Sequence, residues 1–359
     1  MSAHEILIII MAVFAGVGAI DRILGNKLGL GQEFENGILA MGSLALAMVG
    51  IIALAPVLAS LLRPVVVPVY SFLGADPAMF AGTILASDMG GGALAQELSA
   101  DPQAALFGGV LCGSMLGATI VFTIPVAMGI LREEDRPAMA KGILAGIVTI
   151  PVGLLVGGIV AGFPVIMVLR NLIPIVLIAA LIALGLWKAE KAMIKGFGIF
   201  GKGVIIVITI GLAAAIIQSL TGFAIIPGMA PIEEGFLTVG AIAIVLAGAF
   251  PLVFAITKLL KKPLLKVGKL LGVNDTAAAG LVASLANSIA TFGMVKDLDN
   301  RGKVVNIAFA VSAAFVFGDH LGFTAGFAPE MLPAMIIGKL AGGISAVAVA
   351  IWLTKKEKR

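Results

Sequence analysis

Long apolar runs dominate this chain and restrict what it can fold into. A helix that crosses the ~30 Å hydrocarbon core of a bilayer needs about 20 apolar residues. Only 12% of the 359 residues are charged, too few to give a soluble protein of this length a polar surface. We therefore expect an all-α polytopic membrane protein in the lipid bilayer, and we exclude a soluble enzyme or a disordered chain. Nine stretches qualify as transmembrane helices: 4–24, 37–61, 104–130, 138–162, 164–187, 203–222, 235–257, 304–327 and 331–353.

Two further apolar stretches, 77–97 and 275–295, are shorter or interrupted by polar residues. Each follows an amphipathic segment, 63–73 or 261–272. Lys and Arg concentrate in cytoplasmic loops. If both stretches are re-entrant, entering and leaving the membrane on one side, 21 of the 24 basic residues fall in cytoplasmic segments. The charge pattern thus predicts two re-entrant segments, an external N-terminus and a cytoplasmic C-terminus.

Three basic residues, Arg63, Arg170 and Lys339, lie outside this charge pattern. Arg170 and Lys339 are each within two turns of an external span end, so we expect both to snorkel to the lipid headgroups. No base precedes the N-terminal apolar run. We therefore interpret that run as the first span of a multi-pass protein of the cytoplasmic (inner) membrane, and not as a signal peptide.

An internal repeat emerges when the chain is displaced against itself by 198 residues. All five glycines between positions 37 and 82 then fall on glycines, so that Gly37, Gly42, Gly50, Gly74 and Gly82 match Gly235, Gly240, Gly248, Gly272 and Gly280. With 46 glycines in the chain, such a coincidence has a probability of roughly 10⁻⁵ to 10⁻⁴ per register. Five predicted crossings separate the two copies, and an odd number makes the repeat inverted. Many secondary transporters have this architecture, with discontinuous helices meeting near the membrane midplane.

The repeat divides the chain into five parts. They are a first helix and cytoplasmic loop (1–36), repeat 1 with its re-entrant segment (37–162), two linking helices (163–234), repeat 2 with its re-entrant segment (235–353) and a basic cytoplasmic tail (354–359). This organisation favours a transporter or a channel. The alternative is a repeat that only builds a symmetric helix bundle.

Asp88 is the strongest candidate for a binding residue. An ionisable side chain at membrane depth is costly and is a functional candidate for that reason. Asp88 follows Ser87 at the expected tip of the first re-entrant segment and precedes three glycines at 90–92, which permit broken backbone and close approach to a ligand. A carboxylate there can pair with a cationic substrate. The alternative role is an N-cap of the returning half-helix.

Two more polar positions interrupt the second half of the chain. Asn287 and Ser288 occupy the tip of the second re-entrant segment and offer uncharged partners for a hydroxyl or an amine, although helix capping is an equal alternative. Asp319 and His320 lie within the predicted span 304–327. They are candidates for cation binding or for proton relay, and the alternative is a buried pair that only locks the helix.

Other site chemistries find no support in the sequence. The phosphate-binding, zinc-protease and serine-hydrolase motifs GxxxxGK[ST], HExxH and GxSxG are absent, so no cofactor and no enzyme activity is predicted. Cys112 is the single cysteine and His4 is the only histidine besides His320, which does not favour a metal site. We expect no nucleic-acid partner. With one Tyr and two Trp, an aromatic cage for a cation would have to be built from Phe.

The chain resembles the EutH family, the ethanolamine permeases of bacterial ethanolamine utilisation. The resemblance is carried by MGSLALAMVG at 41–50, ALAPVL at 53–58, DPAMFAGT at 76–83, SDMGG at 87–91, GILAGIVTIP at 142–151, RGKVVN at 301–306, AVSAAF at 310–315 and GDHLGF at 318–323. It covers nearly the whole chain. The turn at 162–164 and the loop at 223–234 look shorter than the family pattern, and both are predicted to be external.

The resemblance implies uptake of ethanolamine, and it assigns no site residues. Ethanolamine is a small ammonium alcohol, so its site needs one anion and a few neutral partners. Asp88 or Asp319 fits the first role, and Asn287, Ser87 and Ser288 fit the second. We expect alternating access between the repeats and, by analogy with carriers that have re-entrant segments, a homodimer. The alternatives are a cation-coupled carrier for another amine or a carboxylate, a channel-like pore, or a membrane-embedded enzyme.

Overall fold

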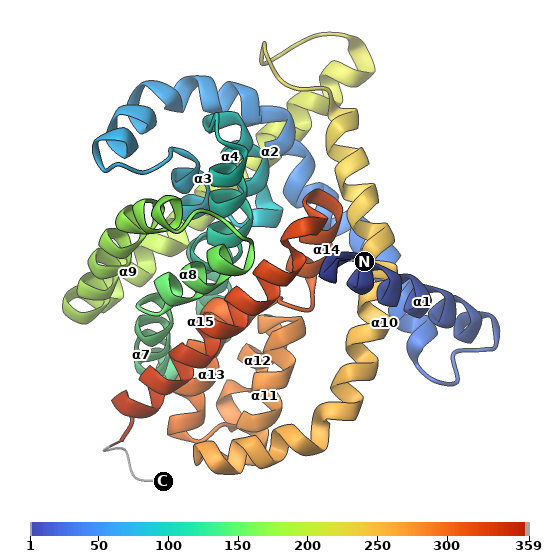
Figure 1. The fold of residues 1–359 in the computed structure, drawn as a ribbon, viewed down its shortest axis with the longest axis vertical. Helices are drawn as coiled ribbons and strands as arrows, with labels where there is room; N and C mark the ends of the chain where they lie inside the picture. Colours follow the sequence, from blue (N-terminus) through green and yellow to red (C-terminus); the bar gives the residue numbers. More distant parts are fainter. Residues whose placement is uncertain (1, 356–359) are drawn as a thin grey trace.

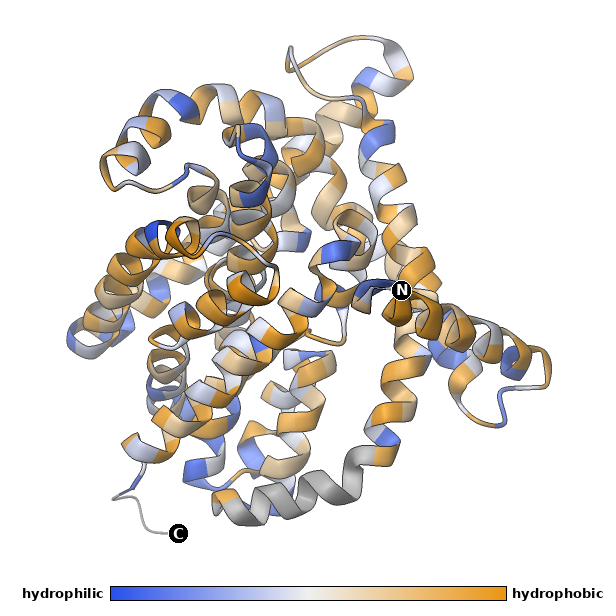
Figure 2. Ribbon diagram, in the orientation of Figure 1, coloured by the Kyte–Doolittle hydropathy of each residue, from blue (hydrophilic) through white to orange (hydrophobic). Residues whose placement is uncertain are grey.

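The computed structural model describes residues 2–355, without the side chains of 260–270, and every regular element in this part is a helix (Figure 1). Residues 356–359 of the predicted tail lie outside the described part. Seven of the described helices are long and apolar enough to cross a membrane. Apolar residues line most of their length (Figure 2). The chain is therefore a multi-pass helical membrane protein, as the apolar runs predict.

Eight of the nine predicted spans fall within the long helices of the described part. These helices are α1 (Ala3–Ile23), α2 (Leu30–Phe72), α7 (Arg136–Ile147) with α8 (Ile150–Val160), α9 (Val165–Thr221), α10 (Ile232–Leu271) and α15 (Leu332–Leu353), together with the composite segment 102–130. α9 joins two predicted spans across a kink, where Ala189 has φ −142° and ψ 46°. The amphipathic segments 63–73 and 261–272 continue α2 and α10 and are not separate helices.

The ninth predicted span is not one helix. Over 304–327 the sequence predicts one continuous transmembrane helix, but α13 (Asn300–Ala313) ends at Ala313 and α14 (Asp319–Phe327) begins at Asp319. The backbone between them turns through Phe315, which has φ +62°, a rare conformation for a bulky residue. The backbone N–H groups that the break leaves without a helical partner donate to carbonyl oxygens of α11. Phe315 N donates to Ser284 O (3.1 Å), and Phe317 N donates to Leu285 O (2.8 Å). The prediction fails because these tertiary partners stabilise a break inside an apolar run.

The corresponding span of the first half also departs from α-helical geometry. The segment consists of α5 (Pro102–Leu106), two π-helical pieces, η2 (Phe107–Gly117) and η3 (Thr119–Thr123), and α6 (Ile124–Ile130). π-Helical turns are rare and are frequent at functional sites. The junction at Ala118 lies 198 residues before Val316, in the middle of the break between α13 and α14. The π-helical segment of the first half and the helix break of the second half therefore lie at corresponding positions of the chain.

Each of the two interrupted stretches forms a pair of short helices. The first contains α3 (Ala78–Ile84), the single turn η1 (Ser87–Met89) and α4 (Gly91–Leu98); the second contains α11 (Asp275–Ala286) and α12 (Ser288–Met294). The three remaining elements are the short turns η4 (Glu133–Asp135), η5 (Val295–Asp297) and η6 (Pro329–Met331).

The two ends of each interrupted stretch lie close together. Ser99 Oγ donates to Asp76 Oδ2 (2.9 Å), and Asn274 Nδ2 donates to the Asp297 carbonyl oxygen (3.1 Å). These two pairs are 198 residues apart in the sequence. The α3–α4 pair lies at one end of the molecule and the α11–α12 pair at the other (Figure 1).

α2 and α10 pack against each other through glycines at matching positions. A Cβ on Gly37 would overlap the backbone of Leu246 and Ala247 in α10, and a Cβ on Gly235 would lie 3.0 Å from the Cα of Val49 in α2. Ala247 and Val49 are themselves 198 residues apart. The contact is thus reciprocal, as in a two-fold interface.

This contact gives a stability test. Gly37→Ala should lower the stability of the protein by about 1–3 kcal/mol, because the added methyl group overpacks a helix–helix contact. Gly42→Ala is the matched control in the same helix, since nothing lies within 4 Å of its Cβ position. Thermal unfolding of the detergent-solubilised protein checks this, and equal melting temperatures of the two variants would contradict the packing.

Candidate functional site

Asp88, Asp319 and His320 line one cavity of about 240 Å³. The remaining lining residues are Ser43, Leu44, Ala47, Ala86, Met89, Ala118, Phe122, Ile205 and Phe315. They come from η1, α2, η3, α9, α14, the helical residue Ala118 between η2 and η3, the turn at Ala86 and the helix break at 314–318. The volume equals about eight times the ~30 Å³ share of one water in the liquid, which suits a ligand of a few heavy atoms.

Asp88 reaches the cavity because the chain is forced to turn at the tip of the first interrupted stretch. Gly90 has φ +89°, and a Cβ there would collide with Ile51 of α2, so only glycine fits. Gly90 is also the N-cap of α4, and that cap makes no side-chain hydrogen bond. The alternative in which Asp88 caps α4 is therefore wrong. Its carboxylate is free to face the cavity.

Asp319 and His320 reach the same cavity from the opposite half of the chain. They are the first two residues of α14, directly after the break. A Cβ on Gly318 would overlap the carbonyl oxygen of Ala286, so this glycine seats the break against the end of α11. His320 Nε2 lies 3.6 Å from Asp88 Oδ1, an ion-pair distance when the imidazole is protonated. The break thus brings Asp319 and His320 to Asp88, which lies more than 200 residues earlier in the chain.

Two phenylalanine rings line the cavity beside its charged residues. Phe122 and Phe315 pack edge to face with ring centroids 5.5 Å apart, and Phe315 lies 5.4 Å from the His320 ring. The face of an aromatic ring attracts a cation within about 6 Å. The cavity therefore combines carboxylates with aromatic faces, a combination that favours a small organic cation over an anion.

Lys339 is buried close to these charges and does not snorkel as predicted. It is 1% exposed, and its Nζ donates to the Ser114 carbonyl oxygen in η2. It also interacts electrostatically with Asp88 and His320. The prediction fails because α7, α8 and α13 surround α15 and leave this lysine no route to the headgroups. Arg170 is exposed, as snorkelling requires.

Asn287 lies in a neighbouring cavity of about 320 Å³ that shares Asp319 with the first. Its other lining residues are Glu33, Phe250, Val253, Phe254, Thr257, Ala286, Phe317 and Gly318. Asn287 also caps α12, since its Oδ1 accepts from Ile289 N (2.7 Å). The predicted site between the two tips is thus divided into two cavities, and Asp319 lies between them.

Ser87 and Ser288 line neither cavity. Both are buried, and their hydroxyl groups have no hydrogen-bond partner among the described residues. The serine that lines the first cavity is Ser43. The Ser43 hydroxyl donates to Ala40 O (2.9 Å) and keeps its lone pairs for a donor.

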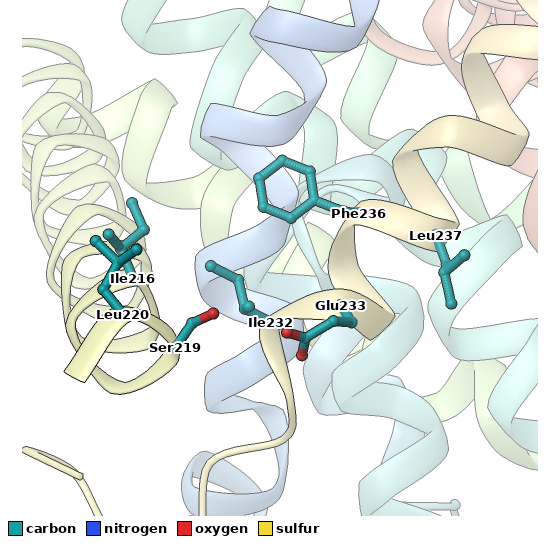
Figure 3. A pocket seen from close by; sticks show the side chains of 7 residues that line it. All are labelled: Ile216, Ser219, Leu220, Ile232, Glu233, Phe236 and Leu237. Atoms are coloured by element: carbon teal, nitrogen blue, oxygen red, sulfur yellow. The ribbon is translucent and has the colours of Figure 1, made fainter. Parts of the chain in front are cut away.

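The other hollows and side-chain clusters of the described structure are weaker candidates for a binding site. A hollow of about 520 Å³ lies between the end of α9 and the start of α10, where Ser219 and Glu233 lie among apolar side chains (Figure 3). None of the predicted site residues lines it. No three His, Cys, Asp or Glu side chains are grouped in the described part of the chain as a metal ion requires.

Sequence reasoning missed Ser43, Phe122, Phe315 and Lys339. Ser and Phe are common packing residues in membrane helices, so nothing in the sequence distinguishes these three. Lys339 carried a signal, because it lies eight residues inside an apolar run and matches Lys141 in the repeat. A charge at that depth is a functional candidate whenever neighbouring helices cover it.

The cavity can be tested by chemical labelling. Ser43→Cys should react with 2-aminoethyl methanethiosulfonate, a small cationic thiol reagent, because Ser43 lines the cavity and is exposed. Ser114→Cys is the matched control, since Ser114 is buried and lines neither cavity. The native Cys112 is buried and should stay unmodified. Mass spectrometry of the intact protein reads out the result, and equal labelling of both variants would contradict the assignment.

Comparison with known proteins agrees with the resemblance seen in the sequence. The family model described as "Ethanolamine utilisation protein, EutH" matches residues 3–353. A Listeria monocytogenes protein named probable ethanolamine permease EutH is 65% identical over 99% of this chain and 95% of its own length. A Salmonella typhimurium protein of the same name is 49% identical over 99% of this chain and 97% of its own.

The uncharacterized protein YxeR of Bacillus subtilis is 54% identical over 100% of this chain and 98% of its own length. No solved structure matches the chain. The family model and these relatives align almost from end to end with the chain. The chain therefore belongs to the EutH family.

Proposed function

We propose that this chain is a permease that takes up ethanolamine, and that it is not an enzyme. The family membership supports the class of protein, and the names of the Listeria and Salmonella relatives support the substrate. The observation that carries the proposal is the cavity with two carboxylates at its broken helices. Charged groups at membrane depth mark substrate or ion pathways.

The proposed binding mode follows the chemistry of a small ammonium alcohol. Asp88 and Asp319 replace the hydration of the ammonium group, and the faces of Phe122 and Phe315 add cation–π attraction. Ser43 accepts the hydrogen bond of the substrate hydroxyl. His320 is the partner of Asp88 when no substrate is bound. Asn287 and Asp319 form a second station in the neighbouring cavity, so the substrate can pass from one cavity to the other along Asp319.

The reciprocal α2–α10 contact supports alternating access between two inverted repeats. It also supports longer repeats than the sequence predicts. A Cβ on Gly50 of α2 would overlap Ile208 of α9, and one on Gly248 of α10 would overlap Met11 of α1. α1 and the second half of α9 thus occupy matching places, and their last residues, Ile23 and Thr221, are 198 positions apart. We assign α1 to repeat 1 and the second half of α9 to repeat 2, which leaves the first half of α9 as the link.

The finer features of the membrane arrangement are proposals too. The close ends of the two interrupted stretches support re-entrance from opposite sides. With that topology the N-terminus is external, the C-terminus is cytoplasmic and the protein resides in the inner membrane. A homodimer is proposed by analogy with other re-entrant carriers, and cross-linking in native membranes tests it.

Neutralising the two carboxylates tests the proposed function. Asp88→Asn and Asp319→Asn should each reduce uptake of labelled ethanolamine into proteoliposomes at least about tenfold, or about 1.4 kcal/mol of lost interaction. Asp101→Asn is the control, because Asp101 only caps α5 (Oδ1 to Gln103 N, 2.9 Å) and Asn caps equally well. Normal uptake by both cavity variants would overturn the proposed site.

The alternative substrates and mechanisms predict different results. Ethanolamine should raise the melting temperature of the protein, whereas small carboxylates should not, because the first cavity presents two carboxylates and no basic residue other than His320. A shift produced by carboxylates alone would favour the carrier for acids. Uptake that fails to saturate with ethanolamine concentration would favour a channel-like pore.

A further inference from the structure

The charged side chains around the first cavity leave room for one more cation. Asp88 and Asp319 interact with each other through their like charges. Lys339 acts on Asp88 with its positive charge from α15. A net charge buried in a low-dielectric interior costs free energy, so the cluster favours a total of zero. When both carboxylates are ionised and Lys339 is charged, the cluster needs one further positive charge to reach zero.

His320 is placed to supply that charge when the cavity is empty. Its Nε2 lies 3.6 Å from Asp88 Oδ1, and the side chain is 3% exposed. Its other ring nitrogen, Nδ1, is buried and has no hydrogen-bond partner among the described residues. Histidine is the side chain that gains or loses a proton near neutral pH. A protonated His320 would pair with Asp88 and neutralise the cluster.

Few other charges face His320 from the elements packed around α14. Asp88 faces it from η1 and Lys339 from α15, and Asp319 precedes it in α14 and lines the same cavity. α10 meets α14 through the apolar side chains of Ile242 and Leu246, which cover Gly322 and Gly326. Glu330 in η6 is exposed. The proton on His320 is therefore governed by this one cluster.

On the basis of the proposed function, we infer that a substrate ammonium and a proton on His320 compete for Asp88. The permease therefore exchanges an ammonium ion for a proton. When the ammonium enters, the His320 N–H bond breaks, the proton goes to solvent and the imidazole becomes neutral. When the ammonium leaves, the imidazole takes up a proton and pairs with Asp88 again. The site holds either the ammonium or the proton at each step of alternating access, but never both. Each ammonium that crosses in one direction is therefore matched by a proton that crosses in the other.

Calorimetry on the purified full-length protein tests the exchange. Ethanolamine is titrated at pH 6 in two buffers of different ionisation enthalpy, which yields the number of protons released per ethanolamine bound. Ethanolamine itself remains charged there, because an alkylamine has a pKa of about 10. We expect net proton release by the wild type, because a protonated His320 gives up its proton when the ammonium replaces it at Asp88. His4→Gln is the matched control and should behave as the wild type, because His4 is at the exposed N-terminus.

Two substitutions of His320 separate proton exchange from a structural role. His320→Gln is permanently neutral, so its ethanolamine binding should release almost no protons and should not weaken as the pH falls. His320→Arg is permanently charged, so its binding should weaken at least about tenfold. If the two variants lose binding equally, His320 has only a structural role and the inference is wrong. Wild-type proton release by His320→Gln would also overturn it.

Proteoliposomes test the transport step. An acidic interior should drive uphill accumulation of ethanolamine by the wild type and not by His320→Gln. Protein-free liposomes measure the trapping of neutral amine, and that background is subtracted. Binding by the wild type without proton release would overturn the exchange and leave the proposed function intact. Absence of any ethanolamine binding would overturn the proposed function and the exchange with it.

Discussion

The site depends on hydrogen bonds that satisfy unwound backbone inside the helix bundle. A free N–H in hydrocarbon costs several kcal/mol, so a membrane helix can break only where another group accepts the bond. Between α13 and α14 the carbonyl oxygens of Ser284 and Leu285 accept from Phe315 and Phe317. These bonds hold the start of α14 in place. Without them the segment would continue as one helix, and Asp319 and His320 would not meet Asp88.

Close glycine contacts bring the two broken regions together. Gly90 turns the first tip beneath Ile51 of α2, and Gly318 seats the second break against Ala286. Gly82 and Gly117 let the first interrupted stretch approach the π-helical segment at backbone distance. The helices can therefore approach so closely that their polar groups interact inside the membrane. Larger side chains at these glycine positions would hold the helices apart. Dispersion contacts and small residues supply the packing that the hydrophobic effect cannot supply between helices in lipid.

The charge cluster explains why a small cavity can be both polar and stable. Asp88, Asp319, His320 and Lys339 come from three elements of the described structure, and each alone would be costly at this depth. Together they approach electrical balance, with one position left for a mobile cation. In the exchange that we infer, an ammonium ion and a proton are alternatives for that position. Binding and coupling would then be two consequences of the same electrostatic requirement.

The sequence alone determined the fold class, most of the long apolar helices and most of the charged candidates, because apolar run length and the cost of a buried charge are local properties. It also identified Asp88, Asp319 and His320 through their positions in apolar runs. The tertiary structure decided where the helices break, since the partners of Phe315 and Phe317 lie about 30 residues earlier in the chain. It likewise decided that Lys339 is buried, that Asn287 lies in a second cavity and that two Phe rings face the first. Those outcomes depend on which helices pack together, and no local pattern of residues specifies that.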